Sequence, residues 1–276
     1  MLSPRDIQRK IRTVRNIQQI CRAMKTVSSI KLRKAQEAIA AASPYAEALR
    51  EIVSRLSCDG ECSHPLLQAH YPETHYGIVA ISSDKGMAGS YNANLIRTAT
   101  SQVHEKHDVI VFPIGRKVTD AFRRTEMKID TSISPLGSPA FSVISALADH
   151  IGELYTSGKL DHVNLVYTKF GYGLHTLQLL PIIPPEDNDT SGSYIFEPSP
   201  EVIIDSILPR YLRTVLYTAV LSSVAAEHAA RVASMSLATE NADELIDKLT
   251  MEYNKSRQSG ITSDLTDIVG AAEALR

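Results

Sequence analysis

The stretch LRTVLYTAVLSSVAAEHAARVASMSL, residues 212–237, decides the architecture of this chain. Apolar and small residues recur in it at alternating steps of four and three, which is the heptad spacing of a coiled-coil seam. Most seam positions hold small residues, so a partner helix can approach closely. The predicted seam consists of Leu212, Leu216, Ala219, Ser223, Ala226, Ala230, Ala233 and Leu237.

The helix that contains this seam is predicted to be very long. The 67 residues after Pro209 contain no further proline and only two glycines, Gly260 and Gly270. At ~1.5 Å per residue such a helix would extend on the order of 100 Å, which is too long for a compact domain of this size to bury. We therefore expect it to pair with another helix.

A second long helix is predicted near the N-terminus. No glycine or proline lies between Pro4 and Pro44, and Ser3, Pro4 and Asp6 are typical of a helix start. Apolar residues recur there at steps of three and four, so we expect the two terminal helices to form an antiparallel coiled coil. The apolar positions are Ile7, Ile11, Val14, Ile17, Cys21, Met24 and Val27.

The first helix is also strongly basic. Residues 1–35 hold ten Lys or Arg and a single acid, although the whole chain has 29 basic and 31 acidic residues. The overall balance does not favour a protein whose main ligand is nucleic acid. We expect one apolar stripe of this helix to pack on the partner helix and its cationic remainder to face other proteins. The stripe consists of Ile20, Met24, Val27 and Ile30.

The middle of the chain has the alternating pattern of an α/β domain. Runs of β-branched and aromatic residues are separated by helical stretches, which indicates a mostly parallel sheet with helices on it. The last run follows the turn GYG closely, so it is expected to pair as an antiparallel hairpin. The predicted strands are 76–82, 108–115, 161–170 and 174–182, and the predicted helices are 92–107 and 138–159.

These segments predict an α/β fold with a long antiparallel coiled coil of the terminal helices and a central Rossmann-like domain. The coiled-coil helices are assigned to 1–57 and 196–276, a linker to 58–75, and the central domain to 76–195. No stretch approaches the ~18 consecutive apolar residues of a transmembrane helix, so no direct membrane span is expected.

No motif indicates catalysis. The loop SSDKGMAGSYN, residues 82–92, lacks the Gly-Lys-Ser/Thr of a P-loop and the three glycines of a dinucleotide site, so it is interpreted as a strand-to-helix turn. Cys58, Cys62 and His64 have no second ligand pair at zinc-site spacing. We expect no catalytic residue, no cofactor and no metal.

Several segments, in order and from end to end, resemble the gamma subunit of F-type ATP synthases. They include QQICRAMKTVSSIKLRKAQ at 18–36, the loop at 82–92, YIFEP at 194–198, and AAEHAARVASMSLATENADELIDKLTMEYNKSRQSGIT at 225–262. The chain departs from the family's usual sequence at two places. Met87 and Ala88 replace Leu and Cys, and Gly260, in a pair that is commonly two alanines, should weaken the helix by ~1 kcal/mol relative to Ala.

The resemblance implies a central-stalk rotor shaft without a catalytic site of its own. In that family the terminal helices lie inside a ring of three alpha and three beta subunits, and ATP is made and hydrolysed on beta. The α/β domain binds epsilon and sits on the ring of c subunits, so rotation of the ring is coupled to the catalytic cycle. The residues that match partner contacts to the alpha/beta head are Met24, Lys25, Arg231, Arg257, Gln258 and Thr262.

The resemblance also implies a peripheral position on the cytoplasmic face of a bacterial plasma membrane, with a mitochondrial or plastid location as the alternative. Two other functions remain open. A nucleotide-dependent α/β enzyme with helical extensions would bind ATP by itself, although the P-loop lysine is missing. A basic coiled-coil DNA-binding protein would show an affinity for duplex DNA that falls steeply with salt.

Overall fold

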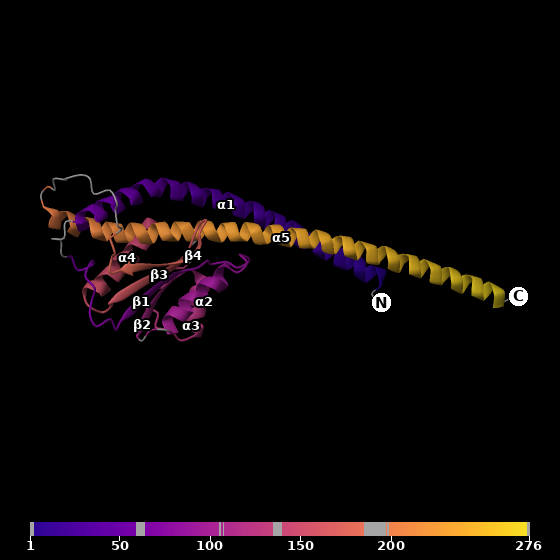
Figure 1. Ribbon diagram of the computed structural model, residues 1–276. Helices are drawn as coiled ribbons and strands as arrows, with labels where there is room; N and C mark the ends of the chain where they lie inside the picture. Colours follow the sequence, from indigo (N-terminus) through magenta and orange to yellow (C-terminus); the bar gives the residue numbers. More distant parts are fainter. Residues whose placement is uncertain are drawn as a thin grey trace. The chain divides into compact units, whose positions relative to one another are not determined.

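The computed structural model describes residues 3–58, 64–104, 106, 108–134, 140–184, 197 and 199–274. Its elements follow in the order α1, β1, α2, β2, α3, α4, β3, β4, α5 (Figure 1). Two compact units are present, one formed by residues 30–230 and the other by residues 1–29 together with 231–276. The helices are α1 (Pro4–Cys58), α2 (Tyr91–His104), α3 (Arg116–Arg124), α4 (Phe141–Thr156) and α5 (Pro200–Ala274). The strands are β1 (Tyr76–Ile81), β2 (Val109–Ile114), β3 (His162–Lys169) and β4 (Gly173–Leu180).

Within the described residues, a four-stranded sheet forms the centre of the unit at residues 30–230. The strand order is β2-β1-β3-β4, with β1 parallel to both of its neighbours and β4 antiparallel to β3. Gly77 of β1, for example, lies opposite Ile110 of β2 and Val163 of β3. The predicted mostly parallel sheet with a final antiparallel hairpin is confirmed.

Helices cover both faces of this sheet (Figure 1). Alternate residues of a strand point to opposite faces, so Ile78 and Ala80 pack with α2 and α3, whereas Val79 and Ile81 pack on the other side. That second face contacts α4, the end of α1 and the start of α5. Full burial of one large apolar side chain contributes roughly 1.5–3 kcal/mol. Buried side chains of this face include Leu56, Ile144, Ile151, Tyr155, Leu165 and Leu216.

Helix α3 was not among the predicted helices. It is short, and its position depends on contacts that are distant in the sequence: Val118 and Phe122 are fully buried, and the main-chain N–H of Val118 donates to Ser82 Oγ at 2.9 Å. Gly115 precedes the helix with φ +97°, and a Cβ there would lie 2.2 Å from the carbonyl oxygen of Ser82. The close packing of β1 on this turn therefore requires glycine.

Both terminal helices pass through a proline. α1 continues beyond Pro44 to Cys58, and α5 begins at Pro200 and includes Pro209. An internal proline removes one main-chain hydrogen bond, but buried side chains hold the helix on the sheet beyond it, such as Val53 in α1. The four-part division of the chain at 57, 75 and 195 stays a prediction.

In the other unit, α1 and α5 form the predicted antiparallel pair. Ile7 and Ile11 pack with Leu249, and Lys25 Nζ donates to Ser236 Oγ at 3.1 Å. Residue numbers rise along α1 as they fall along α5, which defines an antiparallel arrangement. The predicted fold class is thereby confirmed.

The predicted seam on α5 is wrong at its C-terminal end. Positions from Leu212 to Ala226 are buried as expected, but Ala233 is exposed and Leu237 is 60% exposed. A strict heptad drifts by about 20° per repeat on a straight α-helix, which amounts to about 60° over the three repeats after Leu212. Among the residues of α5 after position 230 whose burial the structure describes, the buried positions are Arg231, Met235, Ala242 and Leu249.

The predicted stripe on α1 is wrong as well. Ile20, Val27 and Ile30 are more than half exposed, and only Met24 is half-buried. Ile17, which was assigned to the coiled-coil series, is also half exposed. The buried face instead includes polar residues. Each of the exposed residues Ile17, Ile20 and Val27 comes one position before a buried residue, so it is turned about 100° around the helix from the buried face. The buried residues of α1 up to position 35 are Ile7, Ile11, Gln18, Cys21, Ser28 and Ala35.

Candidate functional site

The outward surface of α1 combines exposed apolar side chains with cations. Ile17, Ile20 and Val27 lie on it, and Arg22 forms an exposed ion pair with Asp243 at 3.5 Å. Exposed pairs of this kind contribute about 0–1 kcal/mol, so they add little to the stability of the fold. A row of exposed apolar side chains rimmed by charge is typical of a protein-binding surface.

The six residues assigned as partner contacts all lie in the unit that contains this helix pair. Lys25 is exposed and bonds to Ser236, and Met24 is half-buried one residue before it. Arg231 is only 5% exposed and is engaged in contacts within the chain. Arg231 is therefore part of the interior of the shaft rather than of an open surface.

The other three assigned residues form an exposed group near the end of α5. Arg257, Gln258 and Thr262 are all exposed, and Thr262 Oγ1 donates to the main-chain oxygen of Gln258 at 3.0 Å. The spacing of four places Gln258 and Thr262 on one side of the helix. α5 continues as a helix through Gly260, and a Cβ at this position would meet no described atom within 4 Å apart from its chain neighbours and the helix's own backbone.

One polar contact in the seam was not predicted from the sequence. Gln18 is 7% exposed, and its Nε2 donates to Oδ1 of Asp243, whose second oxygen faces Arg22. A polar residue at a seam position fixes the register of a coiled coil at some cost in stability. The sequence did contain a signal for this contact, because positions 7, 11, 14, 18 and 21 follow heptad spacing and Gln18 occupies one of them.

The glycine loop at 82–92 is tied to its surroundings by its own polar groups. Asn92 Oδ1 accepts hydrogen bonds from the Ser83 main-chain N–H at 3.1 Å and from Ser83 Oγ at 2.9 Å. Tyr91 donates its hydroxyl proton to the carbonyl oxygen of Ser223 in α5 at 3.1 Å. These contacts connect β1, α2 and α5, as expected for a structural turn.

A carboxylate anchors the segment that leads into β1. Asp161 Oδ2 accepts the main-chain N–H groups of Thr74 and His75, each at 2.9 Å, and Oδ1 lies 3.4 Å from His70 Nδ1. Burial by itself would raise the pKa of Asp161, but these hydrogen bonds outweigh it and lower that pKa to about 2. Asp161 is therefore ionised in the folded protein.

The possible metal ligands do not converge in the part of the chain that the structure describes. His64 is buried, and its Nδ1 accepts the main-chain N–H of Leu66 at 3.0 Å. Burial lowers the pKa of His64, partly opposed by the Asp205 carboxylate. Cys62 and the side chain of Cys58 lie outside the described residues, within which no group of three or more ligands occurs. Over the same residues, no helix is both long and apolar enough to cross a membrane.

The chain matches known proteins along its whole length. The model of the ATP synthase family matches residues 3–275. The ATP synthase gamma chains of Desulfitobacterium hafniense and Moorella thermoacetica are 42% and 41% identical to it, each over 100% of both chains. A solved chain of the Euglena gracilis mitochondrial ATP synthase rotor has a TM-score of 0.68 and 17% identity, and the match covers 94% of this chain and 98% of that one.

The fold defines a class of protein in which helices from both ends of the chain form an antiparallel pair and the middle of the chain forms an α/β domain. The chain belongs to the ATP synthase gamma chain family.

Proposed function

We propose that this chain is the central-stalk rotor subunit of an ATP synthase. In this role it couples ion-driven rotation of a ring to the conformational cycle of catalytic sites on other subunits. The observation that carries the proposal is the antiparallel pair of α1 and α5, which a part-buried hydrogen bond between Gln18 and Asp243 links. A pair of helices held in fixed register resists twisting more than a single helix would.

The chain acts by contact in this proposal, and ATP is made and hydrolysed on the beta subunits. A shaft whose sides differ contacts three surrounding sites differently, and differential contact shifts each site among its states. The outward surface of α1 is uneven, because exposed apolar side chains such as Ile20 and Val27 stand among exposed cations such as Arg22. Rotation then moves each site through the cycle.

The partners proposed for the helix pair are three alpha and three beta subunits. Those proposed for the α/β unit are epsilon and the ring of c subunits. Family membership and the bacterial source of the two gamma chains compared above support this set. The complex would hold the chain peripherally on the cytoplasmic face of a bacterial plasma membrane.

Within the head, Met24 and Lys25 are proposed to face the lever segments of beta, and Arg257, Gln258 and Thr262 to contact a beta loop. The exposure of the last three supports this assignment, because their polar groups are open to a partner. Arg231, which is buried and lies 26 residues before Arg257 on the same helix, is proposed to support the helix pair itself. A neutral hydrogen bond from Gln258 or Thr262 to the beta loop would contribute about 0.5–1.5 kcal/mol.

The test is the double variant Gln258→Ala with Thr262→Ala in the assembled enzyme. The matched control is Thr250→Ala with Asn254→Ala, which also removes one side-chain amide and one threonine hydroxyl from exposed positions on the same helix. Thr250, like Thr262, donates its hydroxyl hydrogen bond to the carbonyl oxygen four residues before it. We expect ATP-driven ion pumping to fall severalfold relative to ATP hydrolysis in the first variant and to stay near wild type in the control.

Two outcomes separate the claims in this experiment. If the wild-type chain fails to co-purify with a hexameric ATPase, the rotor function is wrong. If it co-purifies but the Gln258 and Thr262 variant pumps normally, only the assignment of that contact is wrong.

A further inference from the structure

The outer edge of the sheet at β4 is open. β4 is the last strand in the order β2-β1-β3-β4, and within the described residues its main chain bonds only to β3. At the opposite edge, β2 is bridged by the segment that includes Ile129 and Ile133. Alternate residues of β4 therefore present N–H and C=O groups without a main-chain partner in that part of the chain.

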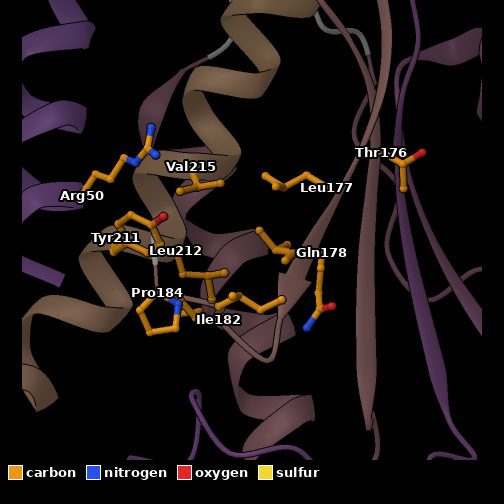
Figure 2. Close-up of a pocket in the computed structure, with 11 residues that line it drawn as sticks. Arg50, Thr176, Leu177, Gln178, Ile182, Pro184, Tyr211, Leu212 and Val215 are labelled. Atoms are coloured by element: carbon orange, nitrogen blue, oxygen red, sulfur yellow. The ribbon is translucent and has the colours of Figure 1, made fainter. Parts of the chain in front are cut away.

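A groove runs along this open edge. Its volume is about 610 Å³, and four consecutive residues of β4, from Thr176 to Leu179, line it. A groove on one face of a sheet would be lined by alternate residues only. Thr176 belongs to the face of α2, where it accepts a hydrogen bond from Gln102 at 3.1 Å, whereas Leu177 points toward Val215 of α5 (Figure 2). The groove therefore lies along the strand edge itself.

The opposite wall of the groove is apolar with one cation. α5 contributes Tyr211 and Val215, and Arg50 reaches toward them from α1 (Figure 2). Arg50 lies near Tyr211 (Figure 2), and its charge opposes the rise in the Tyr211 pKa that burial causes. Among the described residues Arg50 has no ion pair within 4 Å, so an acidic group entering the groove would be the complementary charge.

The sequence of β4 has none of the usual protection of an exposed edge. Natural sheets cover or blunt such edges with lysine, proline or inward-pointing charge because a bare edge pairs with other chains. GLHTLQLL, residues 173–180, contains no Lys, Arg, Asp, Glu or Pro. An edge of this composition is expected to be covered permanently in the working protein.

We propose that the edge of β4 and its groove bind an extended segment of another subunit of the same ATP synthase, added to the sheet as a fifth strand. The segment places an apolar side chain between Leu177 and Val215 and a carboxylate beside Arg50. Main-chain hydrogen bonds supply affinity in this mode of recognition, and the pockets for alternate side chains supply specificity. The inference rests on the proposed function, because permanent cover requires a permanent assembly.

The first test is amide hydrogen exchange of the full chain, alone and in the purified ATP synthase. We expect peptides covering residues 174–179 to exchange at least ~100-fold more slowly in the enzyme. Peptides from the central strand β1 should be slow in both samples and show that the chain is folded. Fast exchange of 174–179 in both samples would overturn the proposal.

The other possible occupants give different results. If the chain's own residues 185–198 cover the edge, residues 174–179 are protected in the free chain as well, and replacing 185–198 by a Gly/Ser linker removes that protection. If a second copy covers it, protection in the free chain rises with its concentration. Either result would overturn the proposal, while co-purification with the ATPase would leave the rotor function intact.

A charge reversal then tests the acidic contact. Arg50→Glu should return the 174–179 peptides in the purified enzyme toward fast exchange, by tenfold or more. Arg124→Glu, an exposed arginine of α3 on the other face of the sheet, is the matched control and should leave exchange unchanged. Equal protection in the two variants would rule out the acidic partner residue.

Discussion

The substitution Asp161→Asn is expected to destabilise the α/β unit by about 2 kcal/mol. The ordinary pKa of the side chain is 3.8, and in the folded protein it is about 2. One pKa unit corresponds to ~1.4 kcal/mol, so the difference corresponds to about 2 kcal/mol of stability from the ionised form. The carboxylate is only 9% exposed, so solvent screening reduces this figure little.

The sign of the pH dependence follows from the lowered pKa. Because the folded protein binds the proton more weakly than the unfolded chain, the contribution is fully present above pH 3.8 and is lost as the pH falls through about 2. The difference in unfolding free energy between wild type and Asp161→Asn should therefore be present at pH 5–7 and decrease below pH 4.

Urea unfolding followed by tyrosine fluorescence measures this effect, since the chain has 11 tyrosines and no tryptophan. The control is Asp108→Asn, a carboxylate whose side chain is 51% exposed and whose pairs with His75 and Lys128 span 3.5 and 3.6 Å. It should cost less than ~1 kcal/mol. Equal losses in the two variants, or a loss at Asp161 that does not change with pH, would refute the reasoning.

Two further predictions concern the packing of the sheet and the length of the shaft. Gly115→Ala should lower the free energy of unfolding by at least ~3 kcal/mol. Backbone strain accounts for about 1–3 kcal/mol, and the clash of a Cβ placed 2.2 Å from the Ser82 oxygen adds to it. The control Gly158→Ala, with φ +73° and open space around it, should lower the free energy of unfolding by about 1 kcal/mol in the same urea assay. Truncation after Leu249 removes Gln258 and Thr262 but keeps Ile7 and Ile11 packed on Leu249, so the chain should fold and bind the ATPase head weakly; normal assembly and normal coupled pumping would contradict this expectation.

The sequence patterns that depend on local order predicted the fold well. Strands such as Tyr76–Ile81 are continuous apolar runs because both faces of the sheet are covered, and that composition is visible in the sequence. α3 was missed because nine residues with two buried apolar side chains give little periodic signal. Its position depends on Ser82 and Gly115, which the sequence does not place together.

The outward surface of the shaft was harder to predict than its existence. Hydrophobicity assigned Ile20 and Val27 to the seam, whereas their neighbours Cys21 and Ser28 occupy it. The buried position is held by a serine, and the neighbouring isoleucine or valine is available for a partner that the sequence of one chain does not contain. The groove at β4 could not be predicted either, since it depends on the order of strands in the sheet.

The meeting of Gln18 with Asp243 has a consequence for how the protein is made. The two residues are 225 positions apart, so α1 leaves the ribosome long before its partner helix exists. Closure of so long a loop is entropically unfavourable. The α/β unit reduces this cost, because Val53 of α1 and Leu212 of α5 belong to one hydrophobic core. Folding of that core first would bring the two helices together at one end, from which pairing can proceed toward the termini.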